Sequence, residues 1–421
     1  MEDKSCVSIH LYGGTELEHA IVAAAADGIY VRDRDGRVYI DCASGTFDQP
    51  LGYNHPALVE AIRRQTETLA YAATPLLSDV VLQLAEKLVA VSPANLTRVH
   101  LRDLSGSTAV EGAIKIAQVA TGRRDVIALF RSHHGQSAWA TDVSGDAFRR
   151  GGTPVHGAGV VHVPAPYCYR CFYRMTYPAC GLYCVESIRE FVAYASSGSV
   201  ACVVVEPVLG NGGNIVPPRD YFRKLRGLCD ELGIVLIFDE VQTGLGRLGY
   251  FFAAEYFDVQ PHILVCAKGL GGPVPRAAIL LEERFEATRV QHSFSGASSL
   301  LSAATALATI EALEAPGFLD GVRARGELLG QQLRELAARF AFVGDVRGLG
   351  LMWGLEIVAA DGAPDAARCR RITAAAFEAG LIVRSSQYGR GNVVKLRPPL
   401  VITEPQLGEV VERLERALLA A

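Results

Sequence analysis

The sequence predicts an α/β fold, with a large domain built on a mostly parallel β-sheet and a smaller α+β domain built from both chain ends. Two observations lead to this prediction. In the middle of the chain, near-continuous runs of Val, Ile and Leu alternate with helical patterns, which is typical of parallel strands covered by helices on both faces. After about Ser299 the pattern changes to long helices with few strands, which indicates a second domain.

Composition and charge narrow the class of protein. The 421 residues are 50% hydrophobic, which suits a large core, and the net charge of −4 does not suggest a nucleic-acid or membrane-surface binder. The opening MEDKSCVSIHLYGG is acidic and lacks the apolar run of a signal peptide. No segment offers the roughly 20 apolar residues that would span a bilayer. We therefore expect a cytoplasmic protein whose ten cysteines are mostly thiols.

The individual elements follow from periodicity. Short strands are expected within residues 28–45, around the turn DRDG, and helices over 55–70, 109–120, 219–232 and from Pro405 onward. Further strands are expected at 98–104, 125–130, 159–164, 201–207, 234–240, 263–267, 351–358 and 381–385. We assign residues 1–48 to the N-terminal part of the small domain, 49–298 to the large domain and 299–421 to the C-terminal part of the small domain.

Two of the predicted strands end in reactive side chains. IVLIFDE ends with Asp239 and Glu240, and ILVCAK ends with Lys268. Ligands of parallel α/β sheets bind at the carboxyl ends of the strands, so the acid and the lysine should meet at one edge. Pyridoxal 5′-phosphate (PLP) requires this pair, because its aldehyde needs a lysine and its pyridine nitrogen needs a carboxylate.

A third feature is the small-residue loop LSGSTAVEGAIKIA. Ser105 to Thr108 precede a predicted helix, and we expect Thr108 and Glu111 to form a capping box. The free amides at such a helix start favour a phosphate, although an ordinary capped helix has the same pattern. The run GLGRLG at 244–249 fits a dinucleotide motif, but DEVQT separates it from the strand end, so we do not expect NAD binding.

These motifs resemble those of the class III aminotransferases, the ornithine and 4-aminobutyrate aminotransferase family of fold-type I PLP enzymes. The resemblance covers nearly the whole chain. It rests on GRVYIDCASGTFDQPLGYNHPALVEAI, VVVEPVLGNGGNIVPP, IFDEVQTGLGRLG, AKGLGG and KLRPPLVIT, which follow one another in family order. It implies a PLP-dependent enzyme with a large PLP-binding domain.

The resemblance also implies roles for individual residues. Lys268 would be the Schiff-base lysine, and Asp239 would pair with the pyridine nitrogen. The other expected cofactor contacts are Gly106, Ser107 and Thr108 at the phosphate, Val241 on one ring face, Gln242 at the ring hydroxyl, Glu206, and His133 in place of the usual stacking aromatic. His133 could instead merely hydrogen-bond near the site. Ser295, or Ser293 if the alignment shifts, would reach the phosphate of a neighbouring subunit, which implies a homodimer with shared active sites.

Three departures from the family pattern bear on the substrate. Lys395 stands where amino-acid-specific members carry an arginine, Asn211 replaces a glutamate, and Gln136 replaces a second arginine. Arg397, two residues after Lys395, should share its face in an extended segment. A lysine does not replace a bidentate arginine fork, so we expect a substrate without an α-carboxylate, such as an amino sugar or aminoglycoside in antibiotic biosynthesis. The alternative is that Lys395 or Arg397 still binds a carboxylate.

The expected reaction is transamination between an amino donor and this amine or oxo substrate. A PLP-dependent racemase, epimerase or dehydratase would use the same lysine and is the alternative. A second acid–base group on the far face would distinguish the two, and His133, His134 and the cysteines are candidates. A non-catalytic relative is disfavoured because Lys268 and Asp239 are both present.

The segment CYRCFYRMTYPACGLYC carries four cysteines, Cys168, Cys171, Cys180 and Cys184. Their spacing is compatible with a structural zinc site, and the alternative is a thiol-rich loop without metal. We assign no metal to the catalytic site.

Overall fold

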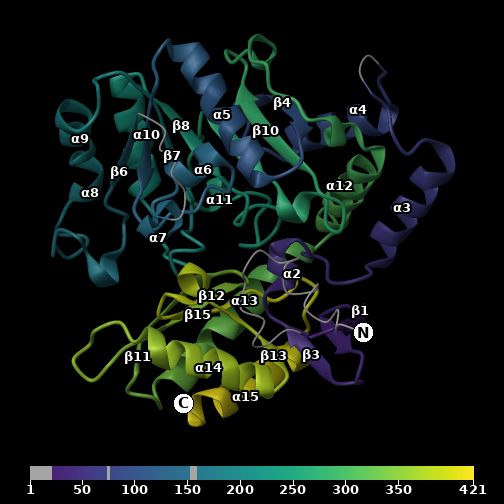
Figure 1. Cartoon of the computed structure of the whole chain (residues 1–421), viewed down its shortest axis with the longest axis vertical. Coiled ribbons are helices and arrows are strands. Elements are labelled where there is room, and N and C mark those ends of the chain that lie inside the picture. Colours follow the sequence, from purple (N-terminus) through teal and green to yellow (C-terminus); the bar gives the residue numbers. More distant parts are fainter. Residues whose placement is uncertain (1–20, 74–75, 152–158) are drawn as a thin grey trace, which may run out of the picture.

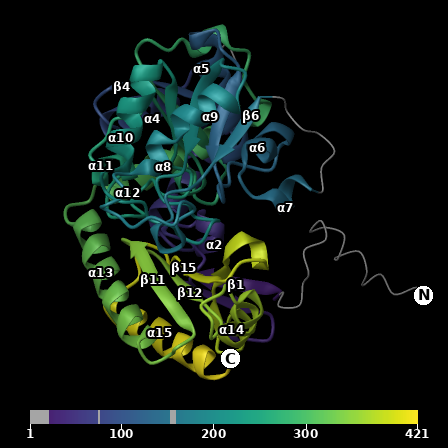
Figure 2. The ribbon, with the colours of Figure 1, turned by 90° about the vertical axis from the view of Figure 1, so that its left-hand side faces the viewer.

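The computed structural model describes residues 21–73, 76–151 and 159–421. The N-terminal stretch on which the absence of a signal peptide was predicted lies outside these residues. Figures 1 and 2 show a large upper part around one sheet and a smaller lower part, where the purple N-terminal strands lie beside the yellow-green C-terminal elements. None of the helices in the described ranges is both long and apolar enough to cross a bilayer.

The large part is built on a seven-stranded sheet with the order β4-β10-β9-β8-β7-β5-β6. Its strands are β4 (Leu96–Asp103), β5 (Asp125–Leu129), β6 (Val160–Val163), β7 (Val200–Val205), β8 (Val235–Asp239), β9 (Ile263–Cys266) and β10 (Ala277–Glu282). The strands from β9 to β6 are parallel, whereas β10 runs antiparallel to both β9 and β4. The predicted mostly parallel sheet is therefore confirmed, and β10 is an addition that the sequence analysis did not predict.

Alternate residues of the central strands are buried against helices on opposite faces. Val204, Ile237 and Val265 share a core cluster with the apolar side of α5 (Gly106–Thr121). Their neighbours on the same strands, such as Val205 and Phe238, share another cluster with α10 (Tyr221–Leu232). Both faces are thus covered, which explains why these strands read as continuous apolar runs rather than alternating ones.

Two four-stranded sheets make up the lower part. One has the order β1-β2-β3-β13, with β1 (Ala23–Asp27), β2 (Tyr30–Asp33), β3 (Val38–Asp41) and β13 (Leu381–Ile382). The other has the order β11-β12-β15-β14, with β11 (Val343–Leu349), β12 (Met352–Ile357), β14 (Arg384–Ser385) and β15 (Val393–Leu396). Because β3 pairs in parallel with β13, the two chain ends form one sheet.

The remaining helices cover these sheets. They are α2 (Ser44–Phe47), α3 (Pro56–Thr68), α4 (Asp79–Ala90), α6 (Ala138–Val143), α7 (Ala147–Arg150), α8 (Tyr183–Glu186), α9 (Ile188–Tyr194), α11 (Ala253–Tyr256), α12 (Leu300–Leu313), α13 (Phe318–Ala337), α14 (Ala366–Glu378) and α15 (Glu404–Leu419). Helix α12 packs on α3 and α4, although the sequence analysis placed it after the boundary at 298. The short α2 lies between the two parts in both views.

Candidate active site

The carboxyl edge of the large sheet brings the predicted acid and lysine together. Asp239 is the last residue of β8, and Lys268 follows β9, the neighbouring parallel strand, in which Val265 pairs with Asp239. The ends of β7 and β5 on the same edge lead into Glu206 and into the segment that carries His133 and His134. The edge therefore gathers residues from four consecutive strands of the sheet, as expected for a site in a parallel α/β fold.

Asp239 is held by a histidine. The residue is 3% exposed, and its Oδ2 atom lies 2.8 Å from Nδ1 of the buried His134. The other carboxylate oxygen accepts the backbone N–H of Val241 at 3.1 Å. Because a carboxylate can only accept, the proton of His134 lies on Nδ1. Asp239 is thus fixed in orientation by one side chain and one backbone amide.

Lys268 occupies a strained and partly buried position. Its φ angle is 47°, in the left-handed region that lysine rarely adopts, and such strain is typical of functional sites. The Nζ atom lies 5.6 Å from the centre of the Phe47 ring, on α2. Loss of hydration lowers the pKa of Lys268, while the charges of Asp239 and Asp48 partly oppose this effect. The amine is therefore closer to the neutral, proton-accepting state than an exposed lysine is.

The loop before α5 forms a helix start, but its cap differs from the predicted one. Ser105 is the N-cap, and its Oγ accepts the N–H of Thr108 at 3.3 Å, while Thr108 Oγ1 accepts the N–H of Ser105. The expected capping box of Thr108 and Glu111 was therefore wrong. Glu111 instead accepts hydrogen bonds from Ser137 and from the N–H of Ala140.

Close packing at this helix start requires small residues. A Cβ on Gly106 would lie 2.9 Å from a methyl group of Val241, and a Cβ on Gly135 would lie 2.5 Å from Oγ of Ser107. Ser107 Oγ accepts the N–H of Gln136 at 3.0 Å. The structure thus brings Val241, Gly106 and Ser107 together at the N-terminus of α5, beside the end of β8.

His133 faces the loop of residues 386–389. Its Nε2 atom lies 3.2 Å from the hydroxyl of Tyr388, and the two rings meet edge to face. Burial lowers the pKa of His133 to about 2, with further lowering by Arg149 and Lys268, so the ring is neutral at physiological pH. Glu206 accepts the N–H of His133 at 2.7 Å and that of Gly210 at 3.0 Å. Glu206 therefore fixes two segments that border the site.

The expected substrate residues lie on the side formed by β15 and the 210–214 loop. Lys395 and Arg397 are 4% and 3% exposed, and neither forms an ion pair within the described part of the chain. Arg397 stacks at 3.8 Å on the Phe47 ring, and its Nη1 atom lies 3.4 Å from Oε1 of Gln242. Nζ of Lys395 lies 3.4 Å from the carbonyl oxygen of Gly210.

The other two departures have different surroundings. Nδ2 of Asn211 donates to Asp146 at 2.7 Å, and Asp146 also accepts from the side chain of Gln387 at 3.0 Å. Gln136 is exposed. Asn211 therefore contributes to the framework between the 210–214 loop and the Tyr388 loop.

Ser295 and Ser293 are both exposed on the loop before α12. The hydroxyl of Tyr71 donates to the carbonyl of Ser295 at 3.0 Å, and the N–H of Ala72 donates to Ser298. Tyr71, Leu76 and Leu77 are exposed apolar side chains. The side chains of Ser293 and Ser295 thus point outward from a firmly held loop.

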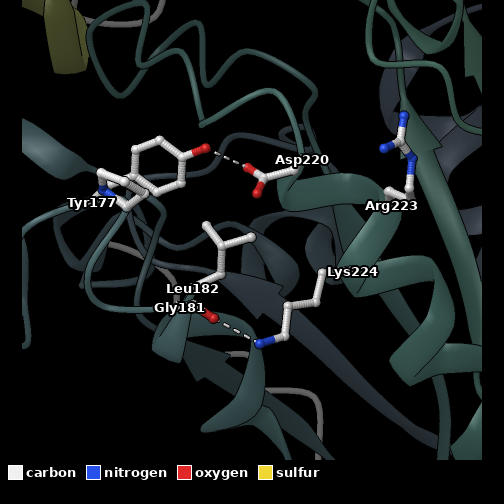
Figure 3. Close-up of a pocket in the computed structure, with 7 residues that line it drawn as sticks. Tyr177, Gly181, Leu182, Asp220, Arg223 and Lys224 are labelled. Atoms are coloured by element: carbon white, nitrogen blue, oxygen red, sulfur yellow. Dashed lines mark hydrogen bonds between the residues drawn. The ribbon is translucent and has the colours of Figure 1, made fainter.

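The cysteine segment, residues 168–184, lies beside α10. Cys168, Cys171, Cys180 and Cys184 are all free thiols, and no cluster of three or more metal-ligating side chains is found among the described residues. Figure 3 shows a hollow between this segment and α10, where Tyr177 donates to Asp220 and Lys224 donates to the carbonyl of Gly181. These hydrogen bonds hold the loop against α10.

Comparisons with known proteins place this geometry in a family. The family model for class-III aminotransferases matches residues 12–418. The chain belongs to the class-III aminotransferases. A leucine/methionine racemase of Thermococcus litoralis is 35% identical over 94% of this chain and 90% of its own length. A probable 4-aminobutyrate aminotransferase of Bacillus subtilis is 31% identical over 95% and 93%.

A solved structure agrees with the fold of this class-III aminotransferase. An amine transaminase from an uncultivated Pseudomonas species, in its PLP-bound form, superposes with a TM-score of 0.91 at 33% identity. The superposition covers 97% of this chain and 98% of that one. The protein is therefore a PLP-dependent aminotransferase with the fold of type I PLP enzymes, as the sequence analysis expected.

The residues of the site fit PLP. A buried carboxylate with a fixed orientation, Asp239, lies on the strand next to the one that leads into a partly exposed lysine, Lys268, whose pKa is lowered by burial. The amides that begin α5 lie beside Val241, and the cradle is so narrow at Gly106 that a Cβ would collide there. Lys268 supplies an amine, Asp239 an acid, and the start of α5 an anion site. These are the three groups that the cofactor requires.

Two residues of the site were not identified from the sequence: Phe47 lies beside both Lys268 and Arg397, and Tyr388 contacts His133. His134, which the sequence analysis named as a candidate acid–base group, is instead hydrogen-bonded to Asp239. The two adjacent histidines in FRSHHGQS could have indicated that His134 supports an acid, since a buried histidine needs a hydrogen-bond partner. Phe47 and Tyr388 come from distant segments, and periodicity offers no signal for either.

Proposed function

We propose that this aminotransferase moves an amino group between an amino donor and an amine or oxo substrate that lacks a carboxylate beside the reacting carbon. The observation that carries this proposal is the surroundings of Lys395. The family arginine is replaced there by a buried lysine whose Nζ atom lies near the Gly210 carbonyl and whose pKa is lowered by burial. Asn211, the second departure, is uncharged, and its side-chain amide donates to Asp146. An amino sugar or aminoglycoside from an antibiotic pathway suits such a site.

The reaction uses the residues at the sheet edge. PLP supplies, when bound, an aldehyde for the lysine and a ring that accepts electrons. Lys268 would hold the cofactor and, once released by the substrate amine, would take the proton from the reacting carbon. Its lowered pKa favours the neutral amine that this step needs. Asp239, oriented by His134, would keep a proton at the ring nitrogen.

The remaining cofactor contacts are proposed on their positions. Gly106, Ser107 and Thr108 would hold the phosphate at the start of α5, Val241 and His133 would lie against the ring, and Gln242 would reach the ring hydroxyl. Glu206 supports this arrangement by holding the backbone of His133. A neutral His133 would lie beside the protonated ring without the repulsion that a charged histidine would bring.

The donor needs an anion contact, and we place it at Arg397. This guanidinium is buried on Phe47, the ring that also lies near Lys268, and its Nε atom has no hydrogen-bond partner in the described structure. A buried charge without a counter-ion is costly, so a carboxylate arriving there would gain a strong interaction. An α-amino acid donor would thus bind through Arg397. When the amine substrate without a carboxylate is bound instead, the guanidinium would keep its hydrogen bond to Gln242.

Racemisation is the second candidate, and the 35% identity to the Thermococcus litoralis racemase favours it. It would require a group that delivers a proton to the face opposite Lys268. The hydroxyl of Tyr388, hydrogen-bonded to neutral His133, is a candidate for that group. A dehydratase would share the first proton transfer and differ only in losing a hydroxyl group.

We also propose a cytoplasmic homodimer in which Ser295, or Ser293, reaches the cofactor phosphate of the partner subunit. Both serines are exposed on a held loop that adjoins the exposed apolar side chains Tyr71, Leu76 and Leu77. Such a surface suits a second subunit. The nine cysteines in the described part of the chain are all free, which agrees with a reducing compartment.

One experiment separates these functions. The PLP-loaded protein is mixed with amino sugars, simple primary amines and α-amino acids, and the absorbance of the bound cofactor is followed. Conversion to the pyridoxamine form by an amine without an α-carboxylate supports the proposal. Exchange of the α-hydrogen in heavy water, with loss of optical activity and without that conversion, supports racemisation instead.

A further inference from the structure

A buried cluster outside the catalytic residues connects the start of α5 to the serine loop. His292, 7% exposed, precedes Ser293, and its Nε2 atom lies 2.9 Å from both Oδ1 of Asp103 and the carbonyl oxygen of Thr108. Its Nδ1 atom lies 3.3 Å from Nζ of Lys115, on α5. Asp103 ends β4 and is fully buried. One imidazole therefore touches β4, α5 and the loop at the same time.

The direction of these hydrogen bonds follows from the partners. A lysine ammonium can only donate, so Nδ1 of His292 accepts, and the ring proton lies on Nε2. The Nε2–H group then donates to Asp103 and Thr108, which both accept. Lys115, His292 and Asp103 form a chain, which we call the His292 relay, and it satisfies both ring nitrogens in a buried place.

Neighbouring groups close the cluster. Nε2 of His100 lies 3.6 Å from Oδ2 of Asp103, and the ring of Phe294 meets His292 edge to face at 5.2 Å. Packing against α5 is so tight that a Cβ on Gly112 would lie 2.5 Å from the imidazole. The histidine thus has no room to change its orientation relative to the helix.

The other end of the serine loop is held in the same way. Arg276, 1% exposed, donates to the carbonyl of Ala297 at 2.8 Å and to that of Leu101, on β4, at 3.1 Å. Between these anchors, the N–H of Phe294 donates to the carbonyl of Arg102. The loop is therefore fixed to β4 at both ends, while the side chains of Ser293 and Ser295 stay exposed.

We propose that the His292 relay is a positioning device for phosphate binding, which sets the first turn of α5 and the serine loop in one fixed relation. The inference rests on the proposed function, in which Gly106 to Thr108 hold the phosphate of this subunit and Ser293 or Ser295 that of the partner. Because His292 bonds to Thr108 and immediately precedes Ser293, it joins both phosphate-binding segments. Its loss would loosen the phosphate contacts of two active sites and leave the ring contacts intact.

The test compares two ligands, PLP and pyridoxal, which differ only in the phosphate. Equilibrium dissociation constants are measured by absorbance for the wild type and for His292→Gln, using the full-length protein stripped of cofactor. We expect the dissociation constant for PLP to rise about tenfold in the variant, as for the loss of one buried hydrogen bond, and that for pyridoxal to change less than about twofold. Equal loss for both ligands would show a merely structural role and overturn the proposal.

A matched control is available in the same domain. His262 is also buried, accepts the N–H of Leu236 at 2.8 Å and lies 2.9 Å from Asp230, but it precedes β9 at the opposite edge of the sheet. His262→Gln should leave the ratio of the two dissociation constants unchanged, and an equal shift in that ratio would contradict the proposal. If His292→Gln does not fold, Lys115→Met removes one end of the relay and should still weaken PLP selectively.

Two further outcomes keep this proposal apart from the proposed function. If the wild type binds PLP and pyridoxal equally well, the phosphate site itself is wrong, whatever the variants do. If the wild type prefers PLP and His292→Gln keeps that preference in full, only the positioning role is wrong. Combining His292→Gln with Ser293→Ala or Ser295→Ala should cost less than the sum of the single effects, because both changes act on the same contact.

Discussion

The Nδ1 atom of His134 lies 2.8 Å from Oδ2 of Asp239, and both side chains are almost fully buried. This contact holds the acid in one orientation at the end of β8. We predict that His134→Leu slows the chemical step by about 10- to 100-fold, as is typical when a supporting partner of a reactive group is lost. Single-turnover rates for the wild type, His134→Leu, His134→Asn and Asp239→Asn would check this. His134→Asn should recover part of the rate, and Asp239→Asn should be slower than either.

Lys268 should be the only lysine that the cofactor modifies. We predict that Lys268→Ala abolishes turnover, because no other amine adjoins the end of β9 in the described structure, while the melting temperature of the cofactor-free protein stays close to that of the wild type. Borohydride treatment of the loaded wild type should attach the cofactor covalently to Lys268. Mass spectrometry of the digested protein would identify the residue, and a label on any other lysine would refute the assignment.

We expect substrate choice to depend on two buried basic side chains, Lys395 in β15 and Arg397 directly after it. We predict that Arg397→Ala lowers kcat/KM for the amino-acid donor by about 10²–10³, since a charge-assisted pair with a carboxylate is lost, and leaves the amine substrate nearly unaffected. Lys395→Ala should change the amine reaction more than the donor reaction. If Lys395→Ala instead erases a strong preference for α-amino acids, Lys395 is the carboxylate contact and the proposed substrate class is wrong.

Glu206 should make the protein less stable as the pH rises. Burial raises the pKa of its carboxyl group from 4.5 to about 7. The folded state therefore binds this proton more tightly than the unfolded state does, and that contribution is lost between about pH 5 and 7. We predict that the free energy of unfolding of Glu206→Gln, relative to the wild type, increases across this window by on the order of 2 kcal/mol. Denaturation of the cofactor-free proteins at pH 5 and pH 8 would measure it, and a constant difference would contradict the raised pKa.

The cysteine segment should not depend on a metal. Its contacts to α10 through Tyr177 and Lys224 hold it in place without one. We predict that treatment with a chelator leaves the melting temperature unchanged, and that elemental analysis finds less than one zinc per chain. A stoichiometric zinc that is lost together with several degrees of stability would instead assign Cys168, Cys171, Cys180 and Cys184 as its ligands.

Much of the fold followed from patterns that act locally. The buried strands β5, β7, β8 and β9 and the helices α3, α5 and α10 were all expected near their observed positions, because continuous apolar runs and helical periodicity are properties of short segments. Strand β10 was not predicted. It lies antiparallel to β9 and no α-helix separates the two strands, so the alternation of strands and helices did not indicate it. The domain boundaries at 48 and 298 stay predictions.

The site was predictable where reactive residues end strands, and less so elsewhere. Asp239 and Lys268 were found because adjacent parallel strands bring their ends together. The cap of α5 was assigned to the wrong residues, since SGST offers several possible N-caps and the structure uses Ser105 with Thr108. Phe47 and Tyr388 could not be placed from the sequence alone, and His134 was named only as a candidate acid–base group and not as the partner of Asp239. Their contacts depend on the order of strands and on loops far apart in the chain.

The pairing of β3 with β13 has a consequence for how the protein is made. Residues 38–41 leave the ribosome hundreds of residues before Leu381, their partner in the sheet. At about 5–20 residues per second, this edge of β3 waits for tens of seconds without its neighbour. Arg397, whose N–H donates to the carbonyl of Cys42, also arrives only at the end of synthesis. The anion contact proposed for the donor is thus among the last parts of the enzyme to assemble, and a prematurely terminated chain would expose an unpaired strand edge to aggregation.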